Sequence, residues 1–534
     1  MKKKIFFPLL LLLPILSFAQ DAQETAEKVG LDQRIDEIFG NATGWFVSFI
    51  FYQIPFTEDV KVFWVLFPLI IGAIYFTIYF KGINFTGFLT SINIVRGKYD
   101  DVDDHTSMVA AGDSTPGGDI KETIAVEKEG EVSHFQALTA ALSATVGLGN
   151  IAGVAIAVSI GGAGATFWMI IAGLLGMASK FVECTLGVKY RDVDENGVVF
   201  GGPMYYLKKG LNNAGLAGLG KVLAVLFAIF VIGGSFGGGN MFQVNQAFQL
   251  VENITGGEAS FLHGKGWLFG VVMAVGVGIV ILGGIKSIAK VTDKVVPFMV
   301  LIYVIASLWV ILSNFGLIGD AFGQIINGAF SPQGVAGGVI GVLVQGFRRA
   351  AFSNEAGIGS ASIAHSAVKT KYAASEGMVA LLEPFIDTVV VCTMTALVLI
   401  ITGNVNPDNA SLNDAQAILL TSESFGSSIS WFPYVLTVAV VLFAFSTMIS
   451  WSYYGYQGWS YLFGRTKAAE YTYKIIFCLF VIVGAAASLG SVIGFSDAMI
   501  FAMMVPNMIG LVILAPRVKE ELAKYMNAIK ASKN

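Results

Sequence analysis

Long apolar runs recur along almost the whole of this 534-residue chain. Hydrophobic residues make up 55% of it and charged residues only 13%, whereas roughly a quarter of the residues in an ordinary soluble domain are charged. A soluble chain of this length would divide into several domains joined by polar linkers. The pattern therefore excludes a water-soluble globular enzyme and predicts a single all-α polytopic membrane protein.

The apolar runs are long enough to cross a bilayer as helices. A hydrocarbon core about 30 Å thick requires roughly 20 consecutive, predominantly apolar residues in a helix. By this criterion the sequence predicts about 11 transmembrane helices, near residues 62–80, 136–160, 164–188, 220–248, 266–285, 292–313, 335–366, 376–402, 431–456, 472–490 and 494–515.

The N-terminus has the composition of a targeting signal. Three lysines are followed by a short apolar stretch and by the small residues Ser17 and Ala19, which is typical of a cleavable signal peptide over residues 1–19. An uncleaved anchor is the alternative. If cleavage occurs, the mature chain begins outside the cytoplasm.

Basic residues orient the predicted spans, because Lys and Arg collect in cytoplasmic loops. With an external N-terminus, most of them fall in predicted cytoplasmic segments, and the external loops 314–334 and 403–430 contain none. We expect a plasma (inner) membrane protein with a cytoplasmic C-terminus. Its expected segments after the signal peptide are an external part (20–61), an extra transmembrane span (62–80), a cytoplasmic acidic loop (81–134), two five-helix units (135–313 and 335–515) and a cytoplasmic tail (516–534).

Several classes of partner are excluded. The net charge is −4, and no basic block follows the first residues, so nucleic acid is not expected as a partner. Three cysteines and four histidines are scattered without metal-ligand spacing, so we expect no cofactor and no zinc or haem site. We also expect a monomer in the lipid bilayer.

The ten spans after the extra one divide into two sets of five. Because five is odd, a second copy of a five-span unit enters the membrane from the opposite side, so any structural repeat is inverted. The first span of each set contains a polar, glycine-rich stretch. These stretches are Ala144–Gly153 and Phe352–Ser360.

We interpret the two stretches as breaks in transmembrane helices. Glycine is a poor helix former, and an asparagine at bilayer depth requires a cavity or a ligand. A broken helix exposes amide donors that suit a carboxylate and carbonyl acceptors that suit sodium. The other glycine pairs, Gly161–Gly162, Gly233–Gly234 and Gly337–Gly338, are better explained by close helix packing.

Seven blocks of sequence resemble the alanine or glycine:cation symporter family. In chain order they are GNIAGVAIAVSIGGAGATFWM, MASKFVE, GGPMYYL, GGIKSIAKVTDKVVPFM, SNEAGIGSASIAHSAVKT, FIDTVVVCTMTALV and FSTMISWSYYG, and the resemblance covers roughly residues 135 to 515. The segment VGLGN also resembles the unwound helix of the leucine-transporter fold. The resemblance implies sodium-driven uptake of alanine or glycine, with proton-coupled or D-alanine variants. The signal peptide and the acidic insert lie outside it.

Candidate ligands follow from the chemistry of an amino acid and of sodium. Amides of the first break suit the carboxylate of the substrate, and carbonyls of the second break suit its ammonium group. Sodium prefers oxygen ligands, and adjacent hydroxyls in the 431–456 span meet this need, although each hydroxyl can instead bond to its own helix. The candidates are Gly147, Gly149, Asn150, Ser353, Asn354, Gly357 and Gly359 for the substrate, and Thr145, Val146, Ser446 and Thr447 for sodium.

Ionisable residues at bilayer depth are expensive and are functional suspects. Glu355 either balances a cation or pairs with Arg348 or Arg349, and Asp387 either faces the site or forms an interhelical bond; we assign these four to gating or coupling. Lys180, Glu183 and His365 lie nearer the cytoplasmic end, where snorkelling or a salt bridge explains them. In the fourth span a polar set has a weaker claim on the substrate: Asn240, Gln243 and Asn245.

These residues favour a secondary active symporter that imports a small neutral amino acid with sodium by alternating access. A proton-coupled carrier is the alternative. An ion channel is less favoured because it would require a repeated filter. No P-loop is present, and no cluster of His, Asp or Cys near one interface indicates a membrane enzyme.

Overall fold

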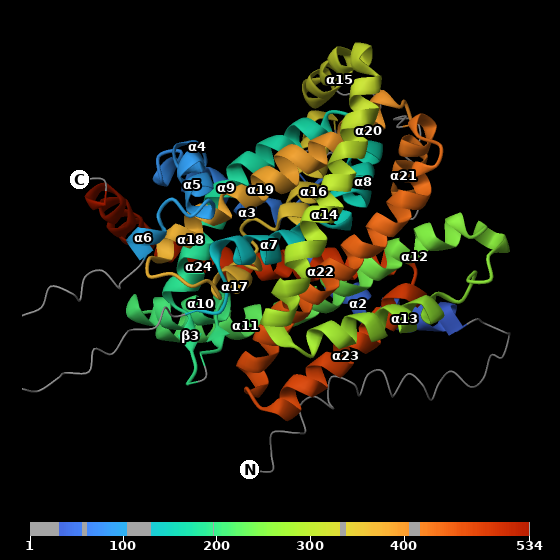
Figure 1. The fold of residues 1–534 in the computed structure, drawn as a ribbon. Coiled ribbons are helices and arrows are strands. Elements are labelled where there is room, and N and C mark those ends of the chain that lie inside the picture. The colour runs from blue at the N-terminus through green and yellow to red at the C-terminus, as the bar shows by residue number, and fades with distance from the viewer. Residues whose placement is uncertain are drawn as a thin grey trace, which may run out of the picture.

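The computed structural model describes residues 31–55, 61–103, 130–195, 197–331, 338–404 and 417–532. Figure 1 shows a bundle of helices with short irregular connections. The predicted signal peptide and the central part of the acidic loop lie outside the described residues.

The N-terminal elements precede the ten-span unit. Helix α2 (Leu31–Ile50) lies against the C-terminal helices α24 (Leu489–Ala531) and α23 (Lys467–Ala486). An antiparallel hairpin follows, in which β1 (Gln53–Pro55) pairs with β2 (Lys61–Phe63). The extra span predicted at 62–80 contains a helix, and short helices follow it. These are α3 (Leu66–Tyr79), α4 (Ile83–Thr86), α5 (Phe88–Val95) and α6 (Asp100–Asp103).

The five spans predicted between residues 135 and 313 all contain helix, and two helices, α10 and α15, lie outside the predicted spans. Its elements are α7 (His134–Thr145), η1 (Leu148–Asn150), α8 (Ala152–Gly161), α9 (Ala165–Lys189), the antiparallel strands β3 (Asp192–Val193) and β4 (Val199–Phe200), α10 (Pro203–Asn213), α11 (Ala217–Phe236), η2 (Gly237–Met241), α12 (Phe242–Ile254), η3 (Gly257–Ala259), α13 (Gly266–Ile281), α14 (Gly284–Ser313), η4 (Phe315–Leu317) and α15 (Ile318–Phe330).

The second unit runs from α16 to α24. Its elements are α16 (Gly338–Asn354), α17 (Ala361–His365), α18 (Ala373–Ala380), α19 (Leu382–Pro384), η5 (Phe385–Cys392), α20 (Thr393–Ile401), α21 (Ala417–Ser428), α22 (Phe432–Phe463), α23 and α24. Helix α24 continues to Ala531, so the predicted tail after residue 515 extends the last span as helix.

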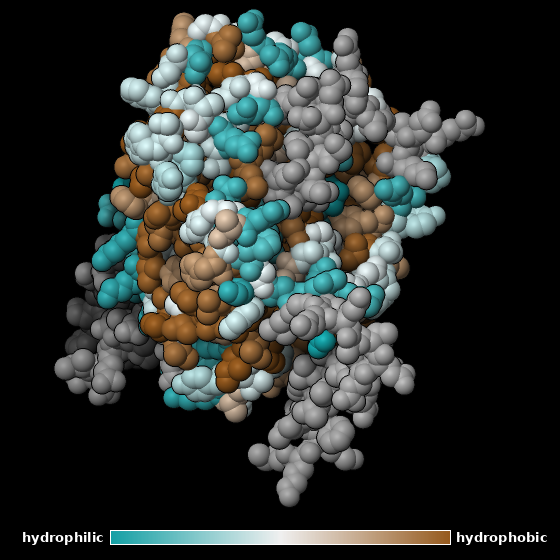
Figure 2. Space-filling model, turned by 90° about the vertical axis from the view of Figure 1, so that its right-hand side faces the viewer, coloured by the Kyte–Doolittle hydropathy of each residue, from teal (hydrophilic) through white to brown (hydrophobic). Residues whose placement is uncertain are grey.

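Length and composition support a membrane location. Seven described helices are each long and apolar enough to cross a membrane, and the bent pair α7 and α8 makes up to eight. Two further apolar helices, α3 and α13, are shorter. Figure 2 shows extensive hydrophobic surface on the face that it presents. The number 11 and the inverted relation of the two units remain predictions.

Two π-helical segments interrupt long helices near the centre of the bundle. Segment η2 joins α11 to α12, and η5 joins α19 to α20. A π turn inserts an extra residue and re-aims the side chains beside it, and such turns are frequent at functional sites. Gly239 in η2 lies so close to Trp451 of α22 that an added Cβ would be 2.2 Å from the indole ring. The glycine therefore allows α22 to approach this turn.

Candidate functional site

The first break is narrow and is closed by its own asparagine. Helix α7 ends at Thr145 and α8 starts at Ala152, and the two halves are bent by 56°. The Gly147 amide donates a hydrogen bond of 2.8 Å to Oδ1 of Asn150. The Asn150 amide in turn donates to the Gly147 carbonyl at 3.2 Å. The break predicted in span two is therefore present, and two of its three candidate amides, those of Gly147 and Asn150, are already bonded within it.

The second break is longer and has an unusual backbone. Helix α16 ends at Asn354, and α17 begins at Ala361. Three residues between them have positive φ angles: Glu355 at 56°, Gly357 at 82° and Gly359 at 99°. This left-handed region favours glycine and costs other residues roughly 1–2 kcal/mol. The Ser360 hydroxyl donates to the Glu355 carboxylate, which holds the strained residue in place.

Asn150 and Ser353 bring the two breaks into direct contact. The Asn150 amide Nδ2 donates to the Ser353 hydroxyl at 3.0 Å and to Asp387 Oδ1 at 2.6 Å. The Ser353 hydroxyl donates to Asp387 Oδ2 at 2.7 Å. The packing is equally close, since an added Cβ on Gly149 would lie 3.4 Å from the Ser353 Cα. Two predicted substrate residues, Asn150 and Ser353, are thus bonded to the carboxylate of a third predicted site residue, Asp387.

Asp387 lies in η5, and it is buried together with the side chains that donate to its carboxylate. Thr388 donates to Asp387 Oδ2 at 2.7 Å, and Asn354 in turn donates to the Thr388 hydroxyl at 2.8 Å. A buried carboxylate requires such compensation in a low-dielectric environment. The sequence left open whether Asp387 forms an interhelical bond or faces the site. In the structure its carboxylate forms interhelical bonds, and these bonds are made with residues of the two breaks. We call Asn150, Ser353, Asn354, Asp387 and Thr388 the aspartate hub.

The C-terminal end of α7 provides oxygen atoms beside α22. The last turn of a helix has carbonyls without intrahelical partners. One of them, on Ser143, accepts a hydrogen bond of 3.0 Å from the Thr447 hydroxyl. A Cβ added to Gly147 would lie 2.7 Å from that same hydroxyl oxygen. Thr447 therefore stands directly at the first break, and its role as a sodium ligand stays a prediction.

Ser446 and Thr145 behave differently from Thr447. The Ser446 hydroxyl donates to Phe443 O of its own helix at 3.0 Å, and the Thr145 hydroxyl donates to Ala141 O at 3.3 Å. This is the back-bonding alternative that the sequence left open. The Ser446 carbonyl, however, accepts from the Ser143 hydroxyl at 2.9 Å. The structure thus separates two adjacent hydroxyls that the sequence treated alike.

Only one residue of the polar set in the fourth span reaches a break. The Leu148 amide donates to Gln243 Oε1 at 3.5 Å. Asn240 and Asn245 donate instead to backbone carbonyls of the segment that runs from α23 to the start of α24. Their role in the structure is interhelical packing.

The arginines of α16 pair with an aspartate that sequence reasoning missed. Arg348 and Arg349 contact Asp497 Oδ2 of α24 at 2.7 Å and 2.9 Å. The ion pair considered between these arginines and Glu355 is therefore replaced by pairs with Asp497. The available signal was an ionisable residue inside the apolar 494–515 run.

Sequence reasoning also missed the surroundings of Lys180, Glu183 and His365. All three side chains have no exposed surface, so snorkelling is wrong for Lys180 and the salt-bridge alternative is confirmed. Lys180 Nζ lies 2.8 Å from Glu383 Oε2. Asn507 of α24 donates to Glu183 Oε2 at 3.1 Å and to the Gly357 carbonyl at 2.9 Å, so it occupies one carbonyl predicted for the substrate ammonium.

A set of hydrogen bonds to backbone groups, which we call the latch, joins separate segments of the chain at the predicted cytoplasmic end. Val132 and Val368 form a parallel bridge, and Arg191 donates to the carbonyls of Ser366 at 2.8 Å and Val368 at 2.6 Å. Glu131 accepts from the Val199 amide of β4 at 2.8 Å. Burial raises the pKa of Glu131, although this hydrogen bond partly opposes the shift. The segments before α7 and after α17 are therefore tied together.

Comparison with known proteins gives a consistent result. The model of the sodium:alanine symporter family matches residues 52–534. The sodium/alanine symporter AgcS of Methanococcus maripaludis is 44% identical over 404 residues, which cover 75% of this chain and 86% of that protein. A Bacillus subtilis protein named "Probable sodium/glutamine symporter GlnT" is 33% identical over 424 residues, covering 78% and 84%.

A solved structure shares the fold. The crystal structure of MhsT in complex with L-phenylalanine superposes with a TM-score of 0.51, covering 72% of this chain and 89% of that one, at 19% sequence identity. This similarity concerns the arrangement of helices alone.

Proposed function

Because the chain belongs to the sodium:alanine symporter family, we propose that it imports a small neutral amino acid, alanine or glycine, together with sodium. The coarser assignment to sodium-coupled amino-acid symport rests on the family and on a relative at 44% identity. The choice of a small substrate and the residues that bind it are our proposal.

The single observation that carries the proposal is the direct contact between the two helix breaks. Asn150 bonds to the first break through Gly147, to the second through Ser353, and to Asp387 between them. Discontinuous membrane helices expose backbone groups that bind ions and substrates, and their polar parts are tolerated only where they are buried in protein or line a cavity. A substrate bound here would contact both five-helix units at once.

We assign the substrate to the space between the breaks. Amides around Gly149 and the side chain of Asn150 would hold its carboxylate, and the Asp387 and Ser353 side chains of the aspartate hub would face its ammonium group. Gly149 packs within van der Waals distance of Ser353, which supports a small side chain. Gln243 and the Phe352 ring border the same region.

We assign the sodium ion to the end of α7. The carbonyls of Thr145 and Val146 belong to the end of that helix and would supply two oxygens, and the Thr447 hydroxyl would supply a third. An ion bound there would tie α7 to α22. By linkage, sodium then raises the affinity for the substrate by the same factor as the substrate raises the affinity for sodium.

Transport then requires that the units alternate in opening. The Arg348 and Arg349 pairs with Asp497 join α16 to α24, and the latch at residues 131–132 and 366–368 joins the segments beside α7 and α17. We assign the arginine pairs to the external side and the latch to the cytoplasmic side of an inner-membrane protein, which works as a monomer without a cofactor.

Uptake into proteoliposomes tests the proposal. Labelled alanine should accumulate with an inward sodium gradient and should only equilibrate without one. Excess unlabelled glycine should compete, and glutamine should not, because the packed breaks leave little room for its side chain. Accumulation driven by a proton gradient alone would favour the proton-coupled carrier, and flux without accumulation would contradict symport.

A further inference from the structure

A group of buried ionisable side chains borders the second break but has no part in the proposed binding of substrate or sodium. Lys180 and Glu183 come from α9, His365 ends α17, and Glu376 and Glu383 come from α18 and α19. None of these five side chains has exposed surface. We call them the histidine cluster.

His365 contacts a carboxylate through both of its ring nitrogens. Nδ1 lies 2.5 Å from Glu376 Oε1, and Nε2 contacts Glu383 Oε1. Each contact between a nitrogen and a carboxylate oxygen requires one hydrogen, but a neutral imidazole carries only one N–H. The chain Glu376–His365–Glu383 therefore holds one proton more than a neutral histidine and two carboxylates would.

The charges around His365 make this proton necessary. Lys180 offsets one of the three carboxylates of the cluster, and it lies 2.8 Å from Glu383 Oε2 and 4.0 Å from Glu183 Oε1. An uncompensated charge buried in a low-dielectric interior is expensive. Other ionisable groups that face the cluster are His134 of α7, Cys184 of α9, Tyr206 of α10, Tyr454 of α22 and Glu355 of the second break.

The cluster connects the predicted cytoplasmic ends of both broken helices. His134, the first residue of α7, contacts the other oxygen of Glu376, while His365 is the last residue of α17. Glu376 thus joins one half of each broken helix. The backbone latch between Val132 and Val368 lies beside it in sequence, and in Figure 1 α10, α17 and α18 lie toward the side where the chain ends.

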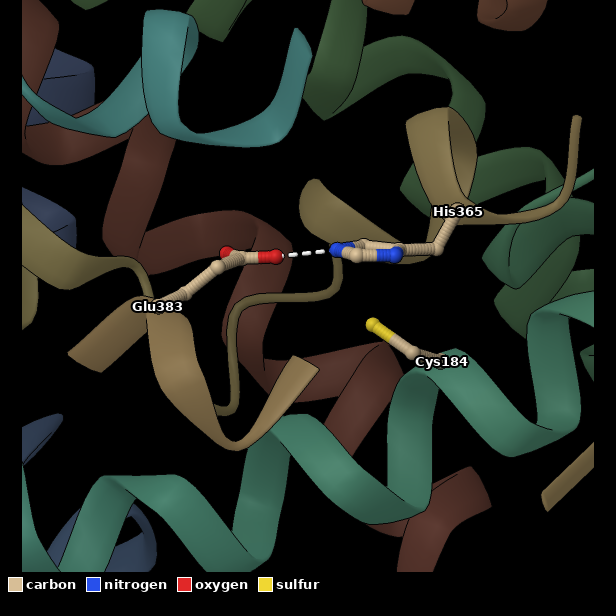
Figure 3. A group of neighbouring side chains, drawn as sticks. All are labelled: Cys184, His365 and Glu383. Atoms are coloured by element: carbon tan, nitrogen blue, oxygen red, sulfur yellow. Dashed lines mark hydrogen bonds and ion pairs between the residues drawn. The ribbon is translucent and has the colours of Figure 1, made fainter. Parts of the chain in front are cut away.

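A metal ion fits this group less well. Cys184, His365 and Glu383 place one ligand atom each within 4.8 Å of the others. Figure 3 shows, however, that the imidazole nitrogen is directed at the Glu383 carboxylate, with the sulfur to one side. Both ring nitrogens are already engaged, and the Lys180 ammonium lies against Glu383. A cation is therefore already present where a metal would bind.

We propose that Glu376, His365 and Glu383 form a proton-binding site that holds the cytoplasmic ends of the two broken helices together while it is occupied. Release of the proton leaves the carboxylates to repel one another, so α7 and α17 separate from α18 and α19. Release of the proton and opening toward the cytoplasm are therefore linked, and each favours the other. The role in transport rests on the proposed function, but the proton site itself does not.

Labelling of Cys184 tests the site without any transport. The thiol is buried beside the cluster, so its reaction with iodoacetamide, read by mass spectrometry of its peptide, reports opening in the full-length protein. We compare labelling rates between about pH 6 and 8.5, where histidine commonly titrates. Ionisation of the thiol by itself raises the rate of alkylation about tenfold per pH unit. If opening also requires the loss of one proton from the cluster, the rate rises by up to about tenfold more per pH unit. We expect this steeper slope in the wild type.

His365→Gln replaces the imidazole with a carboxamide that neither gains nor loses a proton in this pH range, so labelling should return to the slope of the thiol alone. Should His365→Gln fail to fold, Glu376→Gln serves, since it lets a neutral histidine satisfy both contacts. The matched control is His263→Gln, because His263 is 56% exposed and pairs with Glu252 elsewhere; it should keep the wild-type slope. A wild type with only the slope of the thiol, or an unchanged slope in both cluster variants, overturns the proton site.

Two more results separate the alternatives. Stoichiometric zinc retained by the dialysed wild type but lost in His365→Gln would assign the cluster to a metal and overturn the proposal. In proteoliposomes at constant external pH, a more alkaline lumen should accelerate sodium-driven alanine uptake several-fold in the wild type and leave His365→Gln unchanged. If the wild type shows no uptake at all, the proposed function fails, while the labelling result still decides the proton site.

Discussion

The two helix breaks are held in shape by different means. In the first, the Asn150 side chain bonds to the Gly147 amide and holds a short break between two ordinary helices. In the second, the backbone itself turns through three residues with positive φ; Ser360 holds it from within, and Asn507 of α24 holds it from outside. The first break depends on side chains, whereas the second depends on glycine.

This difference suggests separate roles for the two breaks, the first in transport and the second in stability. The first break leaves α7 carbonyls beside Thr447, where we have proposed the sodium site. The second is anchored to α9, α24 and the histidine cluster, so its shape is set by neighbours that would move with it. We therefore expect substitutions in the second break to act mainly on stability, and substitutions in the first to act mainly on transport.

The largest effect is expected at Gly359. Its φ is 99°, and an added Cβ would lie 2.8 Å from Pro203 Cγ and 2.9 Å from Asn507 Cγ. Gly359→Ala should therefore destabilise the protein by about 2–5 kcal/mol, from left-handed strain and overpacking. Thermal denaturation of purified protein, followed by size-exclusion chromatography, measures this.

Gly153→Ala is the matched control for Gly359→Ala. Gly153 lies inside α8, and nothing is within 4 Å of an added Cβ. Alanine is about 1 kcal/mol more favourable than glycine in a helix, so this variant should be as stable as the wild type or more so. Equal stability of the Gly359 and Gly153 variants would remove the contrast between the breaks.

Asn150→Ala should have the next largest effect, now on transport. It removes the contacts that join Gly147, Ser353 and Asp387, and each buried group left without a partner costs about 1–3 kcal/mol. Sodium-driven alanine uptake should fall about 100-fold or more while the protein still folds. The control is Asn240→Ala, which removes an equally buried asparagine whose amide donates to Phe477 O and, within the described ranges, to neither break; it should retain most of the uptake. Similar losses in both variants would mean that any buried asparagine is equally important.

Gly147→Ala tests whether space at the first break matters independently of hydrogen bonds. The φ of Gly147 is −150°, so alanine causes no left-handed strain, but its Cβ would lie 2.7 Å from Thr447 Oγ1. Overpacking of about 1–3 kcal/mol should weaken sodium binding roughly 10- to 100-fold. Sodium dependence of uptake measures the change. An unchanged half-maximal sodium concentration would place the ion elsewhere.

The smallest effect separates two adjacent hydroxyls. Thr447→Ala should raise the half-maximal sodium concentration about tenfold, which corresponds to ~1.4 kcal/mol. Ser446→Ala should change it little, since that hydroxyl bonds to its own helix. If the serine variant loses more sodium affinity than the threonine variant, the assignment of the ion to Thr447 is wrong.

Much of the fold could be read from the sequence, because membrane helices follow from local hydropathy. The boundaries of the 164–188 span differ from α9 by one residue at each end. The breaks were predictable for the same reason: polar residues and paired glycines stand out in an apolar run. Asp387 was identified as a suspect, but not its two bonds to the breaks, since these depend on the π turn that η5 introduces.

Partners distant in the chain could not be predicted. Arg349 and Asp497 are 148 residues apart, and Asn507 and Gly357 are 150 apart. Local composition contains no information about which helix packs on which. For this reason the arginines were considered with Glu355, their neighbour in sequence, and His365 was treated as a residue near the surface.

The sequence by itself determined that this chain forms helices in a membrane, where two of them break, and to which family it belongs, because each of these depends on short stretches of residues. The tertiary structure decided what the breaks contact. It placed Asn150 against Ser353 and Asp387, turned Thr447 toward α7 but Ser446 toward its own helix, and enclosed His365 between two carboxylates. The physical reason is that hydrogen bonds and charges act over a few ångströms, and only packing of distant helices brings these groups within that range.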